Sequence, residues 1–592
     1  TANGGYVSYS LSRSERLKYG IPWTIGVSLD ATPQPTVVYS PTHAVTSRTS
    51  SEGKTRVQVT GNASDGPGPF RLLWKRGTRP VDGFVVGYPP QGKEDGYFLW
   101  VVEAAKPTGT SPQMKREVTL CIDRSGSMKG QRLSQVRGTA GAVLNSLRPA
   151  DTFNIISFNE KVDSLSKTPL GNTVTTLTAA RTYLKNIRPG GGSDIYSALE
   201  TALNQPPPKD RLPIVLFFTD GLPSGGKSNK EVDIRNLAIK NNPHRRRVYT
   251  FGVDVQVNSP LLQRIADETG GQSLFVLPKD SVADKAAPLL KRLQSPVLTG
   301  ATMHSGDANG KGASGRFHAV LPARVPDLFA GDRLVVVGRY RSWKRTMLTL
   351  TGTYFGKRHS LRFEFDPKTA TTRNTFIPRL WAARRVAQLV DIIRQRGATY
   401  KPAYATPSKT TDPTVARCSR EVLDLTARHG VVTEYTAFLA AKGSGAFQAP
   451  ARYSQLLRNF DRRAAQSRVG LGGVSQEYNA NRLKEQTRAD RRNWFWNSRM
   501  QSVRVNSVQP IGDTAMFRQK NGWIDGRLLN GRKLPTPTAT VTFGSSDYWK
   551  LVERLSANGR QRPLSLNGNL QVKDGSGSVL IRRQTHRPPA NP

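Results

Sequence analysis

The chain is poor in cysteine, with only Cys121 and Cys418 among 592 residues. Two thiols cannot build a disulfide framework, and no cluster of cysteine and histidine has the spacing of a zinc site. An exported bacterial protein can also lack disulfides, so the compartment stays open on this ground. Cys121 lies within an apolar stretch, where we expect an inert thiol in the core.

Long apolar runs and familiar catalytic motifs are also missing. No run of eighteen apolar residues occurs, so we expect no transmembrane segment. The first residues, TANGGYVSYS, lack the basic and apolar regions of a signal peptide, so any export signal has been removed or never existed. Neither H-E-x-x-H nor G-x-S-x-G is present, and His43 and His429 fit structural or surface roles better than that of a base. We therefore expect no enzyme.

Acidic residues are scarce compared with basic ones. The 43 Asp and Glu face 87 Lys and Arg, which gives a net charge of +44 and a pI near 10.7. Such a balance favours anionic partners, namely acidic polysaccharide, an anionic cell envelope, acidic protein or nucleic acid, although a solvated surface adapted to its medium is the simpler alternative. The excess forms no single dense tract and no nucleic-acid-binding motif is present, so nucleic acid is the least favoured partner.

The pattern along the chain predicts several domains around one α/β unit. Residues 1–106 read as short β-strands and 107–115 as a linker. In 112–295, continuous apolar strands alternate with amphipathic helices, which predicts a doubly wound, Rossmann-like α/β domain with a mostly parallel sheet. This domain is inserted among β-rich modules.

The remainder of the chain is predicted to hold three further segments. We expect a β-sandwich-like unit with a helical part at 296–442, a basic linker or helix at 443–507, and a β-rich segment at 508–592. Within the linker, residues 479–499, which include NWFWNSR, read as a helix or a flexible connector. The last residues, THRPPANP, read as disordered.

Oxygen-bearing side chains gather where three predicted segments of the α/β unit meet loops. Asp123, Ser125 and Ser127 form D-x-S-x-S in CIDRSGSMKG, Ser193 lies in PGGGSDI, and Asp220 ends FFTD. The carboxyl ends of parallel strands share one edge of a sheet, so these loops should converge there. Hard cations such as Mg2+ prefer oxygen ligands. The sequence therefore predicts a Mg2+ site, with Mn2+ or Ca2+ as alternative ions.

The stretch FFTDGLPSGGKS, residues 217–228, admits a second interpretation. Gly221, Gly226, Lys227 and Ser228 fit the P-loop pattern G-x-x-x-x-G-K-[ST]. However, Pro223 lacks one of the N–H groups that would hold phosphate, and the carboxylate of Asp220 would repel it. We therefore interpret the stretch as a loop of the metal site.

The motifs DRSGSM, GGGSDI and FFTDG, in this order, resemble the metal-ion-dependent adhesion site of von Willebrand factor type A domains. The resemblance covers residues 112–295. It implies that Ser125, Ser127 and Ser193 bind the ion through their hydroxyls, and that Asp123 and Asp220 contact it directly or through water. Ser193 departs from the family, which usually has threonine there; the hydroxyl survives but is less constrained.

The flanking segments extend the resemblance to most of the chain. YSPTHAV, FRLLWKR and DGYFLW resemble the later part of a VIT domain, the module before the A domain in inter-alpha-trypsin inhibitor heavy chains. LFAGDRLVVVGRY and FGSSDYWKLVERL are similar to later segments of the bacterial relatives. The first half of the VIT module is not recognisable, which implies that it was cleaved or is supplied by another chain.

The resemblance implies a secreted or cell-surface binding protein without enzymatic activity. Its A domain would capture an acidic protein ligand through Mg2+, and the basic surface would hold it near anionic polysaccharide or cell envelope. An alternative is a structural protein that assembles into a homo-oligomer or filament, because an incomplete β-module exposes a strand edge. A third alternative, an intracellular Mg2+-dependent partner of an ATPase, is disfavoured by the VIT-like flank.

Overall fold

A computed structural model describes residues 2–3, 6–11, 21–62, 70–104, 114–307, 312, 316–398, 412–440, 450–529 and 535–583, without positions 78, 80, 93, 355, 491, 558 and 576. Residues 107–113 of the predicted linker and the end predicted to be disordered lie outside the described residues. Among the helices of the described part, none is long and apolar enough to cross a membrane.

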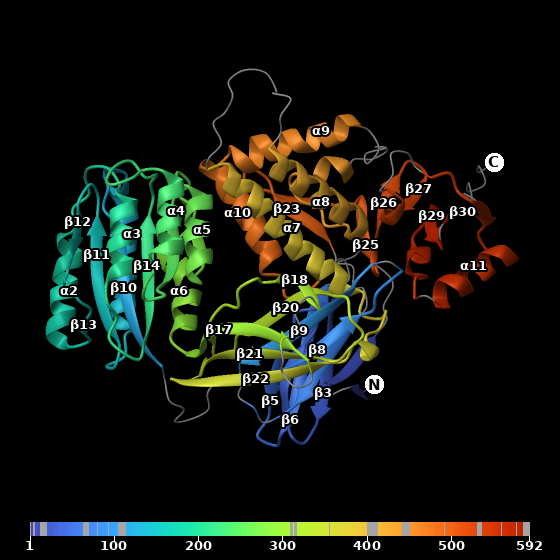
Figure 1. The fold of residues 1–592 in the computed structure, drawn as a ribbon, viewed down its shortest axis with the longest axis horizontal. Coiled ribbons are helices and arrows are strands. Elements are labelled where there is room, and N and C mark those ends of the chain that lie inside the picture. The colour runs from blue at the N-terminus through green and yellow to red at the C-terminus, as the bar shows by residue number, and fades with distance from the viewer. Residues whose placement is uncertain are drawn as a thin grey trace.

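The α/β unit forms the left part of the molecule in Figure 1. Its strands are β10 (Lys115–Asp123), β11 (Thr152–Phe158), β12 (Val162–Ser164), β13 (Leu170–Gly171), β14 (Arg211–Thr219), β15 (Arg247–Val253) and β16 (Ser273–Val276). The sheet order is β12-β11-β10-β14-β15-β16; the strands from β11 to β16 are parallel, and β12 and β13 pair antiparallel with β11. Every strand predicted here is present, and the fold class is confirmed.

Helices cover both faces of this sheet, as the continuous apolar strands require. They are α1 (Gln131–Asn145), α2 (Val174–Asn186), α3 (Ile195–Asn204), α4 (Glu231–Lys240), α5 (Ser259–Thr269) and α6 (Val282–Leu293). Apolar side chains of α1, α2 and α6 share one buried cluster with the sheet, and those of α3, α4 and α5 share another. The sheet therefore lies between two helical layers, which leaves the loops at its carboxyl edge free to form a site.

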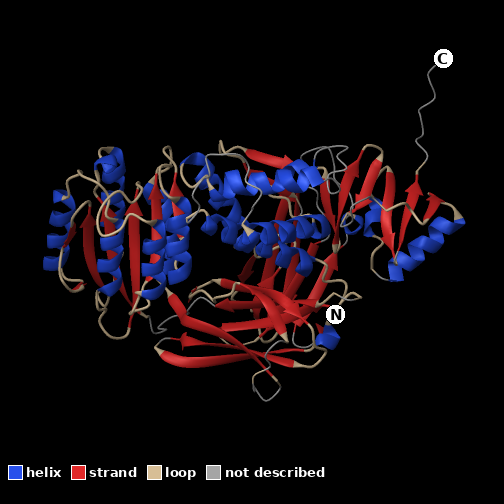
Figure 2. Cartoon of the chain, turned by 45° about the horizontal axis from the view of Figure 1, so that its top comes forward, coloured by secondary structure: helices blue, strands red, loops and turns tan. Residues whose placement is uncertain are grey.

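The α/β unit is inserted between strands of a β-rich body, seen below the helices in Figures 1 and 2. Strands before the insertion are β1 (Ala2–Asn3), β2 (Tyr6–Leu11), β3 (Pro22–Asp30), β4 (Pro35–Tyr39), β5 (Thr46–Thr49), β6 (Lys54–Asn62), β7 (Phe70–Arg76), β8 (Val81–Tyr88) and β9 (Gly96–Ala104). Strands after it are β17 (Pro296–Gly306), β18 (Phe317–Leu321), β19 (Leu328–Phe329), β20 (Arg333–Tyr340), β21 (Thr346–Tyr354) and β22 (Lys357–Phe365).

The two halves of this body are woven together. β9, from before the insertion, pairs with β20, from after it, in the sheet β18-β20-β9-β8. That sheet packs on β19-β17-β21-β22 through an apolar core that includes Trp100 and Phe363. The predicted segments 1–106 and 296–442 thus contribute to one core, and the domain bounds drawn from the sequence stay a prediction.

A helical layer and a C-terminal sheet complete the described chain. The helical layer holds α7 (Phe376–Arg396), α8 (Pro413–His429), α9 (Pro450–Asn459), which continues into a π-helical segment (Phe460–Ala465), and α10 (Gly470–Lys484). The C-terminal sheet, order β25-β26-β27-β29-β30-β28, consists of β25 (Val508–Ile511), β26 (Thr514–Gln519), β27 (Gly522–Asp525), β28 (Ala539–Thr542), β29 (Asn569–Asp574) and β30 (Gly577–Arg582). Helix α11 (Ser546–Ala557) packs on it.

The stretch predicted as a helix or connector at 479–499 is divided in the structure. α10 ends at Lys484, and residues Asn493–Trp496 form strand β23, which pairs with β24 (Ser502–Val505). The prediction of a helix across NWFW was wrong. The aromatic side chains favour an extended strand, and Asn493 and Phe495 alternate toward the interior.

Candidate functional site

Three loops meet at the carboxyl edge of the α/β sheet and bring the five predicted residues together. β10 ends in Asp123, whose carboxylate Oδ2 accepts a hydrogen bond of 2.9 Å from Ser193 Oγ. Ser125 Oγ lies 3.1 Å from Ser127 Oγ, and Ser127 Oγ donates to Asp220 Oδ1 at 2.7 Å. Side chains predicted from three separate motifs therefore form one connected network.

Backbone contacts fix the three loops to one another. The N–H of Gly126 donates to the carbonyl of Gly191 at 2.9 Å. Ser193 and Ser224 are joined twice: the N–H of Ser193 donates to Ser224 Oγ at 2.9 Å, and the N–H of Ser224 donates to the carbonyl of Ser193 at 3.1 Å. The hydroxyls and carboxylates are thus held by backbone geometry and do not depend on long side chains.

Asp123 is a buried carboxylate without a cationic partner. Its side chain is fully shielded from solvent, and among the described residues no Lys, Arg or His forms an ion pair with it. Burial raises its pKa above the ordinary value of 3.8, against the effect of hydrogen bonds from Thr219, Ser125 and Ser193. A buried carboxylate that lacks a counter-charge is the environment in which a cation stabilises the ionised form.

Two residues of the site were missed in the sequence. Thr219, the last residue of β14, donates to Asp123 Oδ2 at 2.6 Å. Arg132, near the start of α1, donates to Asp220 Oδ2 at 2.9 Å and to the carbonyl of Ser127 at 2.8 Å. Thr219 sits inside an apolar strand and Arg132 inside a helical pattern, so only the convergence of the loops assigns them to the site.

The donor chemistry of the site fits a hard divalent ion. Two carboxylates and three hydroxyls offer oxygen atoms only, which suits Mg2+, Mn2+ or Ca2+ better than a soft metal. Within the described part of the chain, no group of three or more His, Cys, Asp and Glu side chains is arranged to hold a metal ion. An ion at this edge would therefore depend on serine hydroxyls, as the sequence predicts.

The geometry of the FFTDGLPSGGKS loop disagrees with a phosphate cradle. Gly226 has φ +82°, and a Cβ there would lie 1.8 Å from the carboxyl carbon of Asp194. Lys227 Nζ donates to Glu200 Oε2 at 2.7 Å, so the lysine is paired with a carboxylate of α3. In a P-loop the helix opens at the Gly-Lys-Ser end, whereas α4 begins only at Glu231. These contacts argue against the nucleotide alternative.

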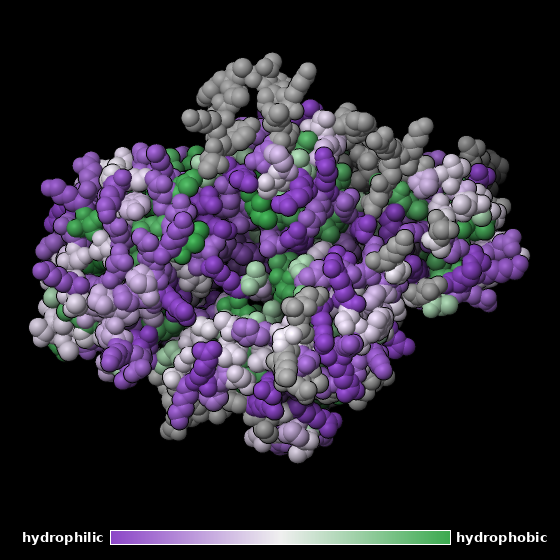
Figure 3. Space-filling view, viewed as in Figure 1, coloured by the Kyte–Doolittle hydropathy of each residue, from purple (hydrophilic) through white to green (hydrophobic). Residues whose placement is uncertain are grey.

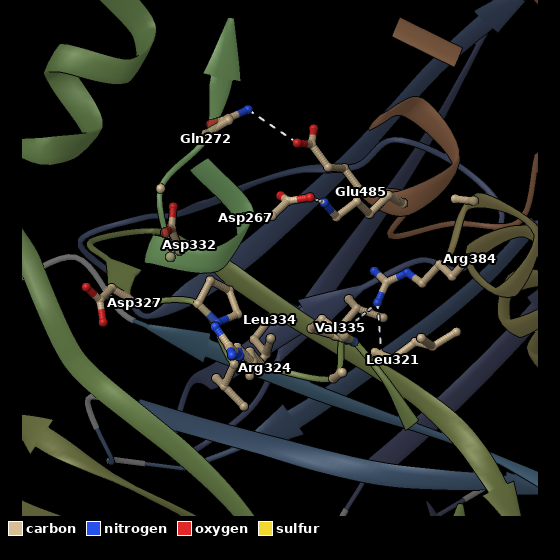
Figure 4. A pocket seen from close by; sticks show the side chains of 18 of the residues that line it. Asp267, Gln272, Leu321, Arg324, Asp327, Asp332, Leu334, Val335, Arg384 and Glu485 are labelled. Carbon is tan, nitrogen blue, oxygen red and sulfur yellow. Dashed lines mark hydrogen bonds and ion pairs between the residues drawn. The ribbon is translucent and has the colours of Figure 1, made fainter. Parts of the chain in front are cut away.

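A separate cavity of about 550 Å³ lies where the α/β unit, the β-rich body and the helical layer meet (Figure 4). It reaches the residues that precede β16, at the amino edge of the sheet, away from the five predicted residues. Its charged lining pairs largely with itself: Lys484 forms an ion pair with Asp267, and Gln272 Nε2 donates to Glu485 Oε1 at 3.3 Å. The cavity is thus a polar junction between parts of the chain.

Hydrophilic side chains dominate the face of the molecule seen in Figure 3. On β22, Lys357, Arg358 and Arg362 are exposed and form no ion pair with any described residue. Many other arginines are paired, as Arg345 is with Glu364 and Asp366. The outer strand β22 therefore carries positive charge that is available to an anionic partner.

Comparison with known proteins identifies the α/β unit. Residues 116–275 match the family model of the von Willebrand factor type A domain. Human inter-alpha-trypsin inhibitor heavy chain H4 is 25% identical over 318 residues, which is 50% of this chain and 33% of that protein. Human heavy chain H6 is 25% identical over 407 residues, which is 64% of this chain and 29% of that protein. The chain thus spans about a third of the length of these curated relatives.

Solved structures with a similar fold include several type A proteins. A von Willebrand factor type A protein from Catenulispora acidiphila has a TM-score of 0.40 and 13% identity, and covers 59% of this chain and 86% of that chain. The ArnB paralog VWA2 from Sulfolobus acidocaldarius has a TM-score of 0.39 and 14% identity, and covers 67% of this chain and 99% of that chain. The family match and the heavy-chain relatives confirm the resemblance that DRSGSM, GGGSDI and FFTDG predicted.

Proposed function

We propose that this chain, which carries a von Willebrand factor type A domain and is related to inter-alpha-trypsin inhibitor heavy chains, is a non-enzymatic binding protein outside the cell or on its surface. It captures an acidic protein ligand through a divalent ion, Mg2+ first and Mn2+ or Ca2+ next. The observation that carries the proposal is Asp123, a buried carboxylate without a cationic partner, surrounded by the hydroxyls of Ser125, Ser193 and Thr219.

The residues divide the work between holding the ion and shaping its surroundings. Ser125, Ser127 and Ser193 would hold the ion through hydroxyl oxygens, with Asp123 and Asp220 in contact directly or through water. When bound, the ion supplies an electrophilic centre that accepts a carboxylate oxygen from the partner. Because hydroxyls are neutral ligands, the site adds only two negative charges, which leaves the ion attractive to a third carboxylate.

The basic surface would add a second, weaker attraction to anionic polymer. Lys357, Arg358 and Arg362 on β22 are exposed, so polysaccharide or cell envelope could pair with them. Contacts of this kind are screened within about 10 Å at 0.1 M salt. The ion would decide which protein ligand docks, and the surface charge would keep the molecule near its anionic surroundings.

Chelation and salt separate these two attractions. Binding to immobilised heparin and to an immobilised peptide that contains one aspartate is measured across a salt series, with and without EDTA. We expect EDTA to release the peptide at moderate salt, while heparin binding falls steeply with salt and ignores EDTA. A matched variant that replaces Lys357, Arg358 and Arg362 by serine should weaken heparin binding only. Peptide binding that ignores EDTA would refute the proposal.

A second candidate is assembly through a free strand edge. β3, with nine residues, ends the sheet β3-β6-β5 and pairs with β6 on one side only. An unpaired edge can accept a strand from another copy. Size-exclusion chromatography with light scattering tests this candidate: a concentration-dependent oligomer that persists in EDTA would favour it over a monomeric binder.

A further inference from the structure

Arg132 occupies a central position at the metal site. It is the second residue of α1, and its side chain is about one-third exposed, which leaves the guanidinium accessible from the ligand side. The guanidinium donates to Asp220 Oδ2, to the carbonyl of Ser127, and to the carboxylate of Asp254. One cation thus joins two carboxylates and the D-x-S-x-S loop.

The pairing leaves no free oxygen on Asp220. Ser127 Oγ donates to Oδ1 at 2.7 Å, and Arg132 Nη1 donates to Oδ2 at 2.9 Å. Asp220 is fully buried, so its charge needs a partner, and Arg132 supplies one inside the chain. Asp123 has no such partner, so the two carboxylates of the site are not equivalent.

The second anchor of Arg132 is itself held in place. Asp254 follows β15 with φ +75°, and its N–H donates to the carbonyl of Val276 at 2.8 Å. The carbonyl of its neighbour Val255 accepts from the N–H of Gly470 at 2.8 Å, which ties this loop to the start of α10. A guanidinium held by Asp254 stays at the rim of the site if its contact with Asp220 is lost.

We propose that Arg132 is a specificity-determining cation of this site, which opposes the divalent ion and favours the acidic ligand. The inference rests on the proposed function. Its positive charge pairs with Asp220 and so weakens the attraction of the site for a dication. The same charge, kept at the rim by Asp254, pairs with the carboxylate that the ligand presents. The site thus selects ligands by the ion and Arg132 together.

A purely structural role for Arg132 makes a different prediction. If the guanidinium only fastened α1 to the ends of β14 and β15, its loss would loosen the site, and both ion and ligand would bind more weakly. A charge-based role moves the two affinities in opposite directions. The sign of the two changes therefore separates the alternatives.

The test uses the whole chain and four proteins: wild type, Arg132→Gln, Arg132→Lys and Arg188→Gln. Arg188 is a control with the same change of charge, because its side chain donates only to the carbonyls of Lys185 and Ile187. Calorimetry measures the affinity for Mg2+ alone. A second titration, at saturating Mg2+, measures the affinity for the peptide acetyl-Gly-Asp-Gly-amide, with its Asn counterpart as the neutral probe.

In Arg132→Gln we expect the affinity for Mg2+ to rise about tenfold, since a neighbouring positive charge is removed, and the affinity for the Asp peptide to fall about fivefold, as expected for a lost charge-assisted hydrogen bond. Arg132→Lys, which keeps the charge, should stay close to wild type in Mg2+ affinity, and Arg188→Gln should match wild type in both titrations. Thermal unfolding confirms that each variant is folded.

Three results would overturn the inference. Weaker binding of both Mg2+ and peptide in Arg132→Gln assigns the residue a structural role. Unchanged affinities in Arg132→Gln, with Mg2+ binding intact in wild type, reject the inference and leave the proposed function standing. If wild type binds no Mg2+, the proposed function fails, and this inference fails with it.

Discussion

Thr219 Oγ1 donates a hydrogen bond of 2.6 Å to Asp123 Oδ2, and this bond joins the ends of two adjacent strands at a buried carboxylate. Both residues are fully buried. The second hydroxyl on the same oxygen comes from Ser193, on another loop. The site is thus built on the rigid end of the sheet, and its central acid is oriented before any ion arrives.

Thr219→Val should lower the stability of the ion-free protein. The substitution preserves shape but removes a donor from a buried carboxylate, a loss of about 1–3 kcal/mol. Urea unfolding in EDTA measures the change. Thr178→Val on α2 is the control, because Thr178 is exposed and its hydroxyl donates only to the carbonyl of Val174. Equal stability of the Thr219 variant and wild type would show that Asp123 does not need this donor.

Asp123→Ala should abolish binding of Mg2+ and Mn2+ and leave the fold intact. The carboxylate lies at the end of β10 and buries no apolar surface of its own, so its loss removes a ligand without opening the core. Calorimetry with each ion is the measurement, and circular dichroism checks the fold. Ion binding that survives in the variant would locate the ion elsewhere.

The five predicted residues could be found in the sequence because each follows an apolar strand or a glycine-rich turn within a regular α/β pattern. Arg132 and Thr219 could not. Threonine is common within strands, and an arginine in the first turn of an amphipathic helix looks like a solvated residue. Their roles depend on which strands are neighbours, and β10 and β14 are adjacent in the sheet although α1, β11, α2 and α3 separate them in sequence.

The β-rich body shows a similar limit of sequence reasoning. Its strands could be predicted individually from short apolar runs, but the pairing of β9 with β20 could not, because the whole α/β unit separates them. Local patterns report periodicity and turns, whereas pairing across a long insertion is decided by packing. The same reason explains why 1–106 was predicted as a module of its own.

Lys227→Ala should leave nucleotide behaviour unchanged, because there is none to lose. Lys227 pairs with Glu200 on the surface, and Gly226 packs against Asp194. A ligand at saturating excess would stabilise the native state by about 3 kcal/mol or more. We therefore expect no rise in melting temperature with Mg-ATP for wild type or variant. A clear rise in wild type that vanishes in Lys227→Ala would restore the P-loop interpretation.

Asp151 should contribute stability that disappears in acid. Burial opposes its ionisation, but hydrogen bonds from Arg116 and Arg148 outweigh it and hold the pKa below the ordinary value of 3.8. Stability from a lowered pKa is present above 3.8 and is lost as pH falls through the folded-state pKa. At neutral pH, Asp151→Asn should cost about 3–5 kcal/mol, because the buried Arg116 loses its partner.

Urea unfolding at pH 7 and pH 3 measures this difference. The gap between wild type and Asp151→Asn should narrow at pH 3. Asp163→Asn is the control: Asp163 forms an ion pair with Arg124 but is largely exposed, so its loss should cost less than about 1 kcal/mol. A gap of equal size at both pH values would mean that the carboxylate charge of Asp151 does not account for its contribution.

The most direct test of the account is a crystal structure of the chain grown with MnCl2, with diffraction recorded at the manganese absorption edge. The account predicts an anomalous peak at the carboxyl edge of the sheet, in contact with the hydroxyls of Ser125 and Ser127 and next to Asp123. No peak at this position in crystals that contain saturating Mn2+, or a peak bound by other residues instead, would contradict it.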